Sequence, residues 1–357
     1  MTSPTPPRID ASVHVFFKDG ADLRRHLREP FRSRGFPDPD VAWYSRPGPK
    51  YAEGTDGADG AHPGSDPALV GRQVLDERGF DYAVLHPMSV AGTLPDWHLG
   101  TALYAATNQM LAERWLESGP YADRFRGTVR VNPNDVEGAV REIERWRDHP
   151  RMVQIGLPVQ TQAPYGRPYF KPLWRAACDA GMPVAVHLEM GVGITHPPTP
   201  SGPTRTYSHH AAYQPMTYIW HLLNMIAEGV FQEFPELKVI WADGAGDMVT
   251  PFMWRMDTFG RPHLEQTPWA PKMPSDYLRD HIYFVHGMLD GPGEAEYASE
   301  WLRMTGKEDM VMFGSSYPDW QTVSPEDLPP GWSAEQRAKV LGGTAAGLFG
   351  IDRLVPA

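Results

Sequence analysis

Four histidines of this 357-residue chain stand where short apolar runs end. His14, His86 and His187 each lie at the end of such a run, and His286 follows a fourth. Imidazole binds metal ions, transfers protons near neutral pH and donates hydrogen bonds to anionic substrates. Four histidines placed in this way predict a shared pocket that handles a metal ion, a proton or an acidic substrate.

The runs that position these histidines are predicted to be strands, because each is short and apolar and is followed by a loop and a stretch of helical period. Eight strands are expected, at Ile9–Val15, Tyr82–His86, Gly127–Val131, Met152–Leu157, Pro183–Leu188, Lys238–Ala242, Ile282–Val285 and Met310–Phe313. Strands that alternate with helices favour an α/β fold, a distorted (β/α)8 TIM barrel that forms one domain over residues 1–357.

In such a barrel the C-terminal ends of the strands build the active site, whatever the reaction. Arg130 at the third strand end suits a carboxylate held by two hydrogen bonds. The expected catalytic residues are His14, His187, His286, Asp243 and Asp319. The expected substrate-binding residues are His86, Arg130, Trp241, Tyr317 and Trp320, with Trp220 as a further aromatic neighbour.

Composition and charge exclude several function classes. The net charge is −11 and the basic residues are scattered among acids, so no stripe neutralises successive phosphates and nucleic acid is not an expected partner. No run approaches the roughly 20 apolar residues of a membrane span, and the first residues lack an apolar signal core. The single Cys178 excludes disulfide stapling within the chain and favours a reducing compartment. We therefore expect a cytoplasmic protein.

Two segments interrupt the alternation of strands and helices. Residues 47–67 are rich in Gly, Pro, Asp and Ala, which predicts a flexible surface insertion between the first two barrel units. Residues 191–215 follow the fifth strand and are long and rich in proline. A loop at that place lies over the barrel mouth, so we expect a lid there.

Several stretches resemble the amidohydrolase-related family, which includes decarboxylases of the aminocarboxymuconate-semialdehyde and dihydroxybenzoate type. The matching pieces are spread in order over nearly the whole chain, and they are IDASVHV at Ile9–Val15, the segment Pro168–Gly191, the segment Glu228–Asp257, VMFGSSYPDW at Val311–Trp320 and VLGGTAAGLFGI at Val340–Ile351. The resemblance implies a metal-dependent barrel that cleaves C–C bonds or hydrolyses its substrate.

Three positions of the implied metal site depart from the family pattern. The family's Asp-x-His-x-His motif falls on Ser12 and His14, so only its second histidine is kept, whereas His187 matches the fifth-strand ligand. The ligand position before Gly-x-Gly falls on Ala242. In the last motif, Gly-Ser-Asp-Tyr-Pro-His, Ser316 replaces the aspartate and Asp319 replaces the histidine. Since hydroxyls are poor ligands, two histidines alone predict weak metal binding.

Three interpretations follow from these departures. The chain is a non-catalytic partner subunit of an active paralogue, or it is a metal-independent enzyme that uses its histidines as acids and bases. In both cases no metal cofactor is expected. The alternative is a metal-dependent decarboxylase or hydrolase in which Zn²⁺ or another divalent ion is bound by His14, His187 and His286. All three predict a small organic acid or amide as ligand, and a homo-oligomer or a hetero-oligomer with the paralogue.

Overall fold

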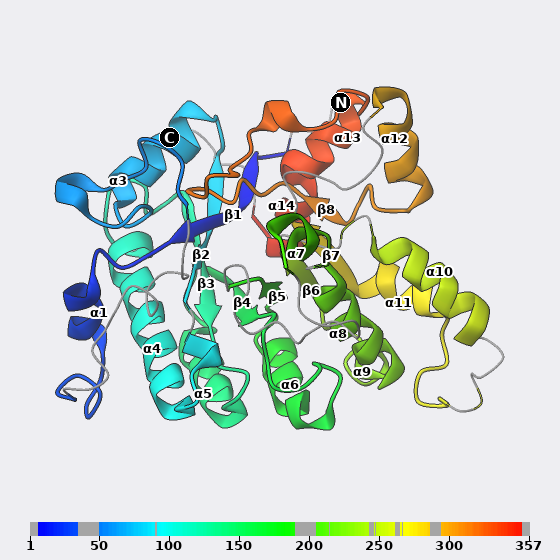
Figure 1. The fold of residues 1–357 in the computed structure, drawn as a ribbon, viewed down its shortest axis with the longest axis horizontal. Coiled ribbons are helices and arrows are strands. Elements are labelled where there is room, and N and C mark those ends of the chain that lie inside the picture. The colour runs from blue at the N-terminus through cyan, green and yellow to red at the C-terminus, as the bar shows by residue number, and fades with distance from the viewer. Residues whose placement is uncertain are drawn as a thin grey trace.

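A computed structural model describes residues 6–34, 50–89, 91–189, 205–213, 215–242, 246, 248–260, 265, 267–285 and 294–351. Eight parallel strands form one sheet whose spatial order, β1 to β8, follows the order of the chain (Figure 1). The strands are β1 Ile9–Val15, β2 Tyr82–Pro87, β3 Phe125–Arg130, β4 Met152–Pro158, β5 Val184–His187, β6 Val239–Ala242, β7 Ile282–Val285 and β8 Val311–Met312.

Backbone hydrogen bonds between the last and first strands bring the two edges of the sheet together. Ala11 N donates to Phe313 O at 2.8 Å, and His14 N donates to Tyr317 O at 2.7 Å. These bonds continue from β8 into the loop after it, so β8 and that loop cover the open edge of β1. The prediction of a (β/α)8 barrel is confirmed.

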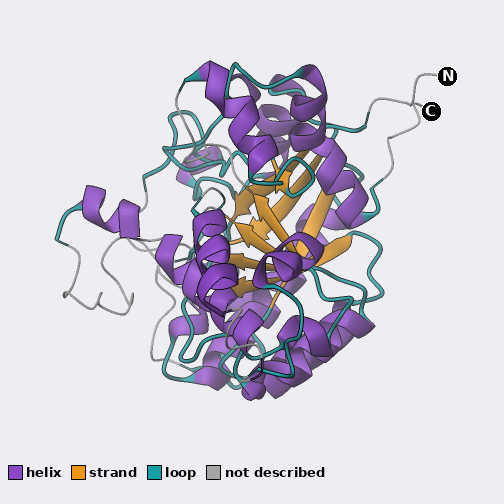
Figure 2. Cartoon of the chain, turned by 90° about the vertical axis from the view of Figure 1, so that its right-hand side faces the viewer, coloured by secondary structure: helices purple, strands orange, loops and turns teal. Residues whose placement is uncertain are grey.

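Helices surround the strands on all sides (Figure 2). They are α1 Gly20–His26, α3 Pro67–Val70, α4 Trp97–Met110, α5 Val136–Trp146, α6 Lys171–Asp179, α7 Tyr207–Tyr213, α8 Pro215–Ala227, α9 Val230–Glu233, α10 Val249–Gly260, α11 Pro274–His281, α12 Ala295–Met304, α13 Ala334–Ala338 and α14 Thr344–Phe349, with π-helical turns η2 Gly71–Glu77, η4 Leu111–Leu116 and η8 Lys339–Gly343. None of the helices in the described ranges is long and apolar enough to cross a membrane.

The period of two along each strand divides the core into two layers. On β6, Ile240 and Ala242 belong to the apolar cluster inside the barrel, whereas Trp241 belongs to the cluster that packs against the helices. Ala345 of α14 and Ile351 join the inner cluster together with residues at the beginnings of β1 and β2. The C-terminal helix therefore covers the N-terminal end of the barrel and leaves the opposite end to the site.

The described part of the predicted surface insertion, residues 50–67, lies beside β1 and the loop after β8. Tyr51 forms an antiparallel bridge with Asp319, and Thr55 and Ser65 are only 3% and 0% exposed. This segment therefore buries polar side chains against the barrel. Of the predicted lid, residues 205–213 and 215 are described and include α7, while 191–204 and 214 lie outside the described residues.

Candidate functional site

Two histidines from opposite strands of the barrel meet at its centre. The Nε2 atoms of His14 on β1 and His187 on β5 lie 3.0 Å apart, and the rings are close to perpendicular, at 81°. Their exposed fractions are 0% and 1%. Because both residues lie in the C-terminal part of their strands, the barrel itself aims these nitrogens at one point.

Each ring has a further polar neighbour on its other nitrogen. Nδ1 of His187 lies 2.7 Å from the carbonyl oxygen of Leu188. A carbonyl only accepts, so Nδ1 carries the proton and Nε2 of the neutral ring presents a lone pair. Nδ1 of His14 lies 3.6 Å from Oδ2 of Asp319, which favours a proton on that nitrogen too. Partners of this kind orient histidine ligands in metal sites.

This pair fits a divalent cation. With both protons on the outer nitrogens, two lone pairs face each other at 3.0 Å, an arrangement that a cation between them stabilises. Two metal–nitrogen bonds of about 2.1 Å that meet at roughly 90° place their nitrogens about 3 Å apart. The same distance suits an N–H···N hydrogen bond, so a metal ion would take the place of a single proton.

A buried charged network lies beside the pair. His86 on β2 stacks on His187, with ring centroids 4.5 Å apart. Its Nε2 accepts a hydrogen bond from Arg130 on β3, whose guanidinium also donates to Glu189, two residues after β5. Tyr104 of α4 donates to Glu189 at 3.2 Å. The crowding requires Gly156 on β4, because a Cβ there would come within 3.0 Å of both His86 and Arg130.

Burial and charge fix the protonation state of His86. Burial, reinforced by the Arg130 guanidinium, lowers the pKa of His86 well below 6.5. Arg130 can only donate, so Nε2 of His86 is the acceptor and its single proton is on Nδ1. His86 is therefore a neutral hydrogen-bond donor. The Arg130 charge is balanced by Glu189 within the barrel, so this guanidinium already holds a carboxylate.

The loop after β8 is attached to β1 through Asp10. Oδ1 of this fully buried carboxylate accepts from Ser12 N at 3.2 Å and from Ser315 N at 3.0 Å. Burial, partly offset by hydrogen bonds from Ser315, raises the pKa of Asp10 to about 6. Gly314 allows this approach, since a Cβ there would lie 2.8 Å from Cβ of Ser12.

Ser12 and Ser316, the two serines that the sequence places at ligand positions of the family pattern, lie near the histidine pair. Oγ of Ser12 is 3.3 Å from Nε2 of His14. Ser316 has φ of 54°, in the left-handed region that few residues other than glycine, asparagine and aspartate adopt readily. Its N–H donates to Ser12 O at 3.0 Å. The backbone thus holds this position against β1 although the side chain is a poor ligand.

The structure corrects the placement of several predicted aromatic residues. Trp241 is 1% exposed and packs against Tyr218 of α8, outside the barrel. Side chains alternate along β6, and that of Trp241 points away from the barrel interior. Tyr317 also points outward and donates to Gln73 of η2 at 2.5 Å. Trp320 and Trp220 are 53% and 63% exposed. Trp241 and Tyr317 are therefore packing residues, and the site is lined by histidines instead.

Two predicted catalytic residues, Asp243 and His286, lie outside the described residues. Within the described ranges, no group of three or more His, Cys, Asp or Glu side chains is arranged to hold a metal ion. The described part of the site thus supplies two possible metal ligands, His14 and His187. Asp319 lies beside the outer nitrogen of His14.

Sequence reasoning did not assign roles to three residues of the network, Glu189, Tyr104 and Asp10. Glu189 has a signal in the sequence, because a carboxylate two residues after a strand-end histidine follows the same strand into the mouth. Tyr104 comes from the middle of α4, and only the fold places its hydroxyl on Arg130 and Glu189.

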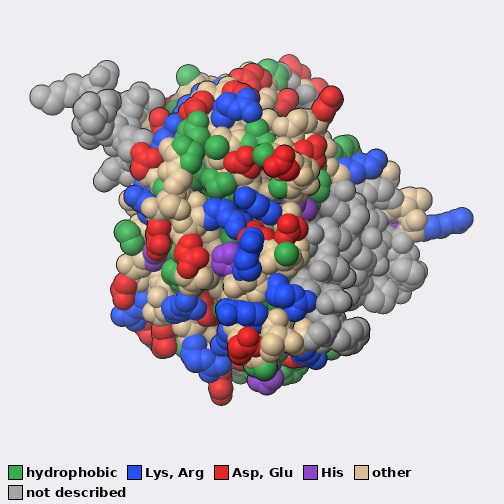
Figure 3. All heavy atoms as spheres, turned by 90° about the vertical axis from the view of Figure 1, so that its left-hand side faces the viewer, with side chains coloured by type: hydrophobic (Ala, Val, Ile, Leu, Met, Phe, Trp, Pro, Cys, Tyr) green, Lys and Arg blue, Asp and Glu red, His purple; other side chains and the backbone are tan. Residues whose placement is uncertain are grey.

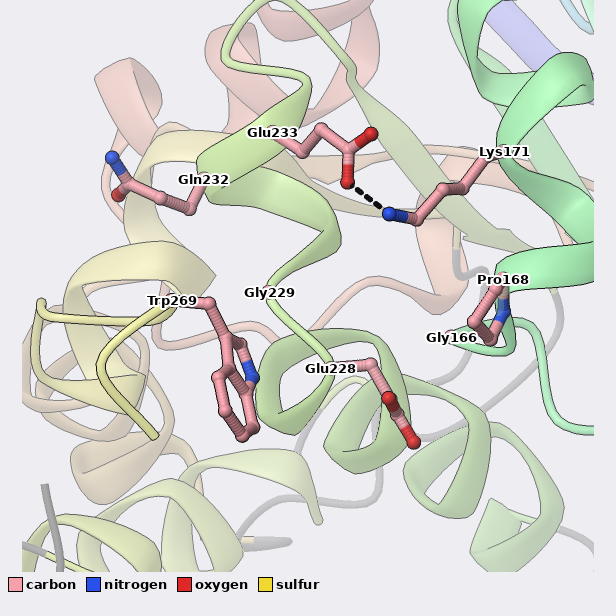
Figure 4. A pocket seen from close by; sticks show the side chains of 8 residues that line it. All are labelled: Gly166, Pro168, Lys171, Glu228, Gly229, Gln232, Glu233 and Trp269. Atoms are coloured by element: carbon pink, nitrogen blue, oxygen red, sulfur yellow. Dashed lines mark ion pairs between the residues drawn. The ribbon is translucent and has the colours of Figure 1, made fainter. Parts of the chain in front are cut away.

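A surface groove of about 320 Å³ contains none of these residues. It is lined by Gly166, Pro168, Lys171, Glu228, Gly229, Gln232, Glu233 and Trp269 (Figure 4). Its Lys171 and Glu233 form an ion pair at 2.6 Å and are both partly exposed. With its one lysine already paired and no histidine, this groove does not offer the chemistry of the barrel mouth.

Comparisons with known proteins agree with this architecture. A family model described as amidohydrolase matches residues 9–351. The chain is 22% identical over 237 residues to gamma-resorcylate decarboxylase from Rhizobium sp. (strain MTP-10005), and the match covers 60% of this chain and 66% of that protein.

Two solved structures share the fold over nearly their full length. An amidohydrolase from Mycobacterium avium subsp. paratuberculosis K-10 has a TM-score of 0.72 and 20% identity, and the match covers 98% of this chain and 99% of that chain. A 5-carboxyvanillate decarboxylase from Novosphingobium aromaticivorans has a TM-score of 0.68 and 21% identity, with 97% and 96% covered. That enzyme was crystallised with manganese and 4-hydroxy-3-methoxy-5-nitrobenzoic acid. This finding overturns the prediction that the protein has no metal cofactor. It points instead to a divalent metal ion.

Proposed function

Because the chain belongs to the amidohydrolase family, we propose that it is a metal-dependent decarboxylase of a small aromatic carboxylic acid. The observation that carries the proposal is the pair of buried histidine nitrogens at the centre of the barrel, 3.0 Å apart. The solved decarboxylase with manganese and a nitrobenzoic acid supports both the metal and the class of substrate.

His14 and His187 are the residues of this chain that would hold the metal ion. Asp319 orients the first ring and the Leu188 carbonyl orients the second. A bound divalent cation supplies Lewis-acid stabilisation of negative charge on substrate oxygens. In the sequence-based alternative His286 completes the ligand set, and this assignment remains a proposal.

Decarboxylation breaks the bond between the ring carbon and the carboxyl carbon, releases CO2 and leaves an electron pair that takes up a proton. The chain must orient the ring and exclude competing proton donors. His86 is neutral, so it serves as a hydrogen-bond donor through Nδ1 and not as the acid. Arg130 positions His86 and is itself held by Glu189, so its effect on the substrate is transmitted through that ring.

The arrangement favours catalysis over a role as a non-catalytic partner subunit. A subunit that only assembles with a paralogue has no need for two buried imidazoles, one hydrogen-bonded to a carbonyl through its outer nitrogen and the other with its outer nitrogen 3.6 Å from a carboxylate oxygen. Buried polar groups cost stability unless they are satisfied, so such a network is retained where it has a use. The oligomeric state and the cytoplasmic location remain predictions.

The test is turnover of hydroxybenzoic acids. Purified protein is treated with a chelator, reloaded with Mn²⁺, and assayed for CO2 release from dihydroxybenzoates and 5-carboxyvanillate. We expect release that needs the metal and that is abolished in His187→Ala, with the circular dichroism spectrum unchanged. Release that is equal in the chelated and reloaded protein, or none from any of these acids, would contradict the proposal.

A further inference from the structure

A second cavity lies outside the barrel, between the segment after α1 and the helices α4 and α5. Its volume is about 170 Å³. Its lining combines basic side chains with small apolar ones, and it consists of His26, Arg28, Arg32, Ala102, Ala105, Ala106, Gln109, Glu142 and Arg145. None of these residues belongs to the histidine site at the barrel mouth.

The segment that carries two of the arginines is fixed by its own hydrogen bonds. Nη1 of Arg24 donates to the carbonyl oxygens of Arg32 and Arg34, both at 3.1 Å. Nε of Arg32 donates to Leu27 O at 2.7 Å, and within the described part of the chain the two terminal nitrogens of this guanidinium have no acceptor. The cavity wall is therefore built before any ligand arrives.

The cavity carries an excess of positive charge. Three arginines face one carboxylate, so these four side chains give the lining a net charge of +2. Within the described ranges, Arg28 has no side-chain hydrogen bond or ion pair. Arg145 donates to Gln109 at 2.5 Å and lies 3.7 Å from Glu142. The whole chain, in contrast, has a net charge of −11.

The one acidic side chain of the lining is occupied by internal partners. Oε2 of Glu142 accepts from Asn108 and from Trp146, each at 3.1 Å, and the residue is 8% exposed. It therefore neutralises the arginines only in part.

Figure 3 shows that basic and acidic side chains alternate over the face of the molecule on the side of α1, so the excess of positive charge at the cavity is local. Arginine forks bind carboxylates and phosphates with two parallel hydrogen bonds.

The opposite wall of the cavity is apolar. Ala102, Ala105 and Ala106 of α4 present methyl groups and leave the volume that longer side chains would fill. These alanines are only 1%, 8% and 2% exposed. A bare inorganic anion would contact the arginines and leave the part of the cavity beside the alanines unfilled. We propose that the cavity binds a small organic oxyanion, a carboxylate or a phosphate monoester with a compact apolar body. This site is independent of the proposed decarboxylase activity.

Calorimetric titration of the full chain with benzoate, phenyl phosphate and inorganic phosphate tests the site. In chelator-treated protein, whose barrel site holds no metal ion to bind a carboxylate, we expect one equivalent of benzoate or phenyl phosphate to bind with an affinity that falls about tenfold in Arg28→Ala and further in the double variant with Arg32→Ala. The stronger of the two ligands identifies the headgroup. His187→Ala must leave this binding unchanged, since that residue lies in the other site.

Arg141→Ala is the matched control. Its side chain is 65% exposed on α5 and lies 3.9 Å from Glu137, so the substitution removes the same charge from the same surface. Binding that is weakened equally in Arg141→Ala would show a general effect of charge and overturn the site. The proposal would also be overturned if binding survived in the double variant, if it were lost in His187→Ala, or if no binding were seen at all. Inorganic phosphate that binds as tightly as the organic ligands would overturn it too.

Discussion

The Nε2 atoms of His14 and His187 lie 3.0 Å apart, although β1 and β5 stand on opposite sides of the barrel. Asp319 and the Leu188 carbonyl favour protons on the outer nitrogens, so the two inner nitrogens direct their lone pairs toward one point. This geometry is the basis of the proposed metal site, although weak binding is expected from the sequence, which places Ser12 and Ser316 at two ligand positions of the family pattern.

Asp319 is expected to raise metal affinity without touching the metal. In Asp319→Asn the carboxylate that orients His14 is lost, so Mn²⁺ affinity should fall about 10-fold to 100-fold, the usual effect of removing such a partner. Calorimetric titration with Mn²⁺ measures the change. Asp148→Asn is the control, because that side chain is 92% exposed and removes the same charge. If Asp319→Asn and Asp148→Asn bind Mn²⁺ with equal affinity, Asp319 does not orient His14 for metal binding.

Ser316→Asp is expected to strengthen metal binding. Aspartate tolerates the left-handed φ of 54° at this position and supplies an anionic oxygen where the family has one. We expect an increase of about tenfold in Mn²⁺ affinity. Ser316→Asn has the same shape and no charge, so it should give little change. If the two variants bind Mn²⁺ equally, this loop does not reach the metal.

Glu189→Gln should destabilise the protein, because Arg130 would be left buried without its counter-charge. Breaking a buried ion pair in this way costs about 3–5 kcal/mol. Urea unfolding at pH 7 measures the loss, and Glu137→Gln, at a side chain 93% exposed, is the control. The double variant Arg130→Met with Glu189→Leu should recover most of the stability. If Glu189→Gln is as stable as Glu137→Gln, the Arg130 guanidinium is in contact with water and not buried.

Asp10 predicts a pH dependence of folding. Its folded pKa of about 6 lies above the ordinary value of 3.8, so the folded state binds this proton more tightly than the unfolded state. The contribution of Asp10 to stability is therefore full below pH 3.8 and is lost as the pH rises through 6. Relative to Asp10→Asn, the wild-type free energy of unfolding should fall by about 2 kcal/mol between pH 4 and pH 7. A constant difference would contradict this account.

The sequence was sufficient for the fold, because each strand is a separate apolar run and each predicted run overlaps its strand by all or most of its length. It also indicated that His14 and His187 share a pocket, since both lie near the C-terminal ends of predicted strands, and the structure brings them together. The direction of a side chain was harder to predict. Trp241 and Ala242 are neighbours on β6, and only the pleat decides that the tryptophan faces α8.

The partners of the charged residues could not be predicted for a related reason. Arg130 and Glu189 are 59 residues apart, and their contact depends on how the third and fifth strands tilt within the barrel. The sequence therefore suggested that the Arg130 guanidinium binds a carboxylate of the substrate. The structure places a carboxylate of the chain itself on Arg130, so the proposed contact with the substrate is assigned to His86 in place of Arg130.

Metal content tests the central claim most directly. The purified chain is incubated with Mn²⁺, freed of excess ion by gel filtration and analysed for metal beside His187→Ala. We predict about one equivalent of manganese in the wild type and a strong loss in the variant, with both proteins folded by circular dichroism. Wild-type protein that retains no manganese, or equal manganese in the two proteins, would contradict the account.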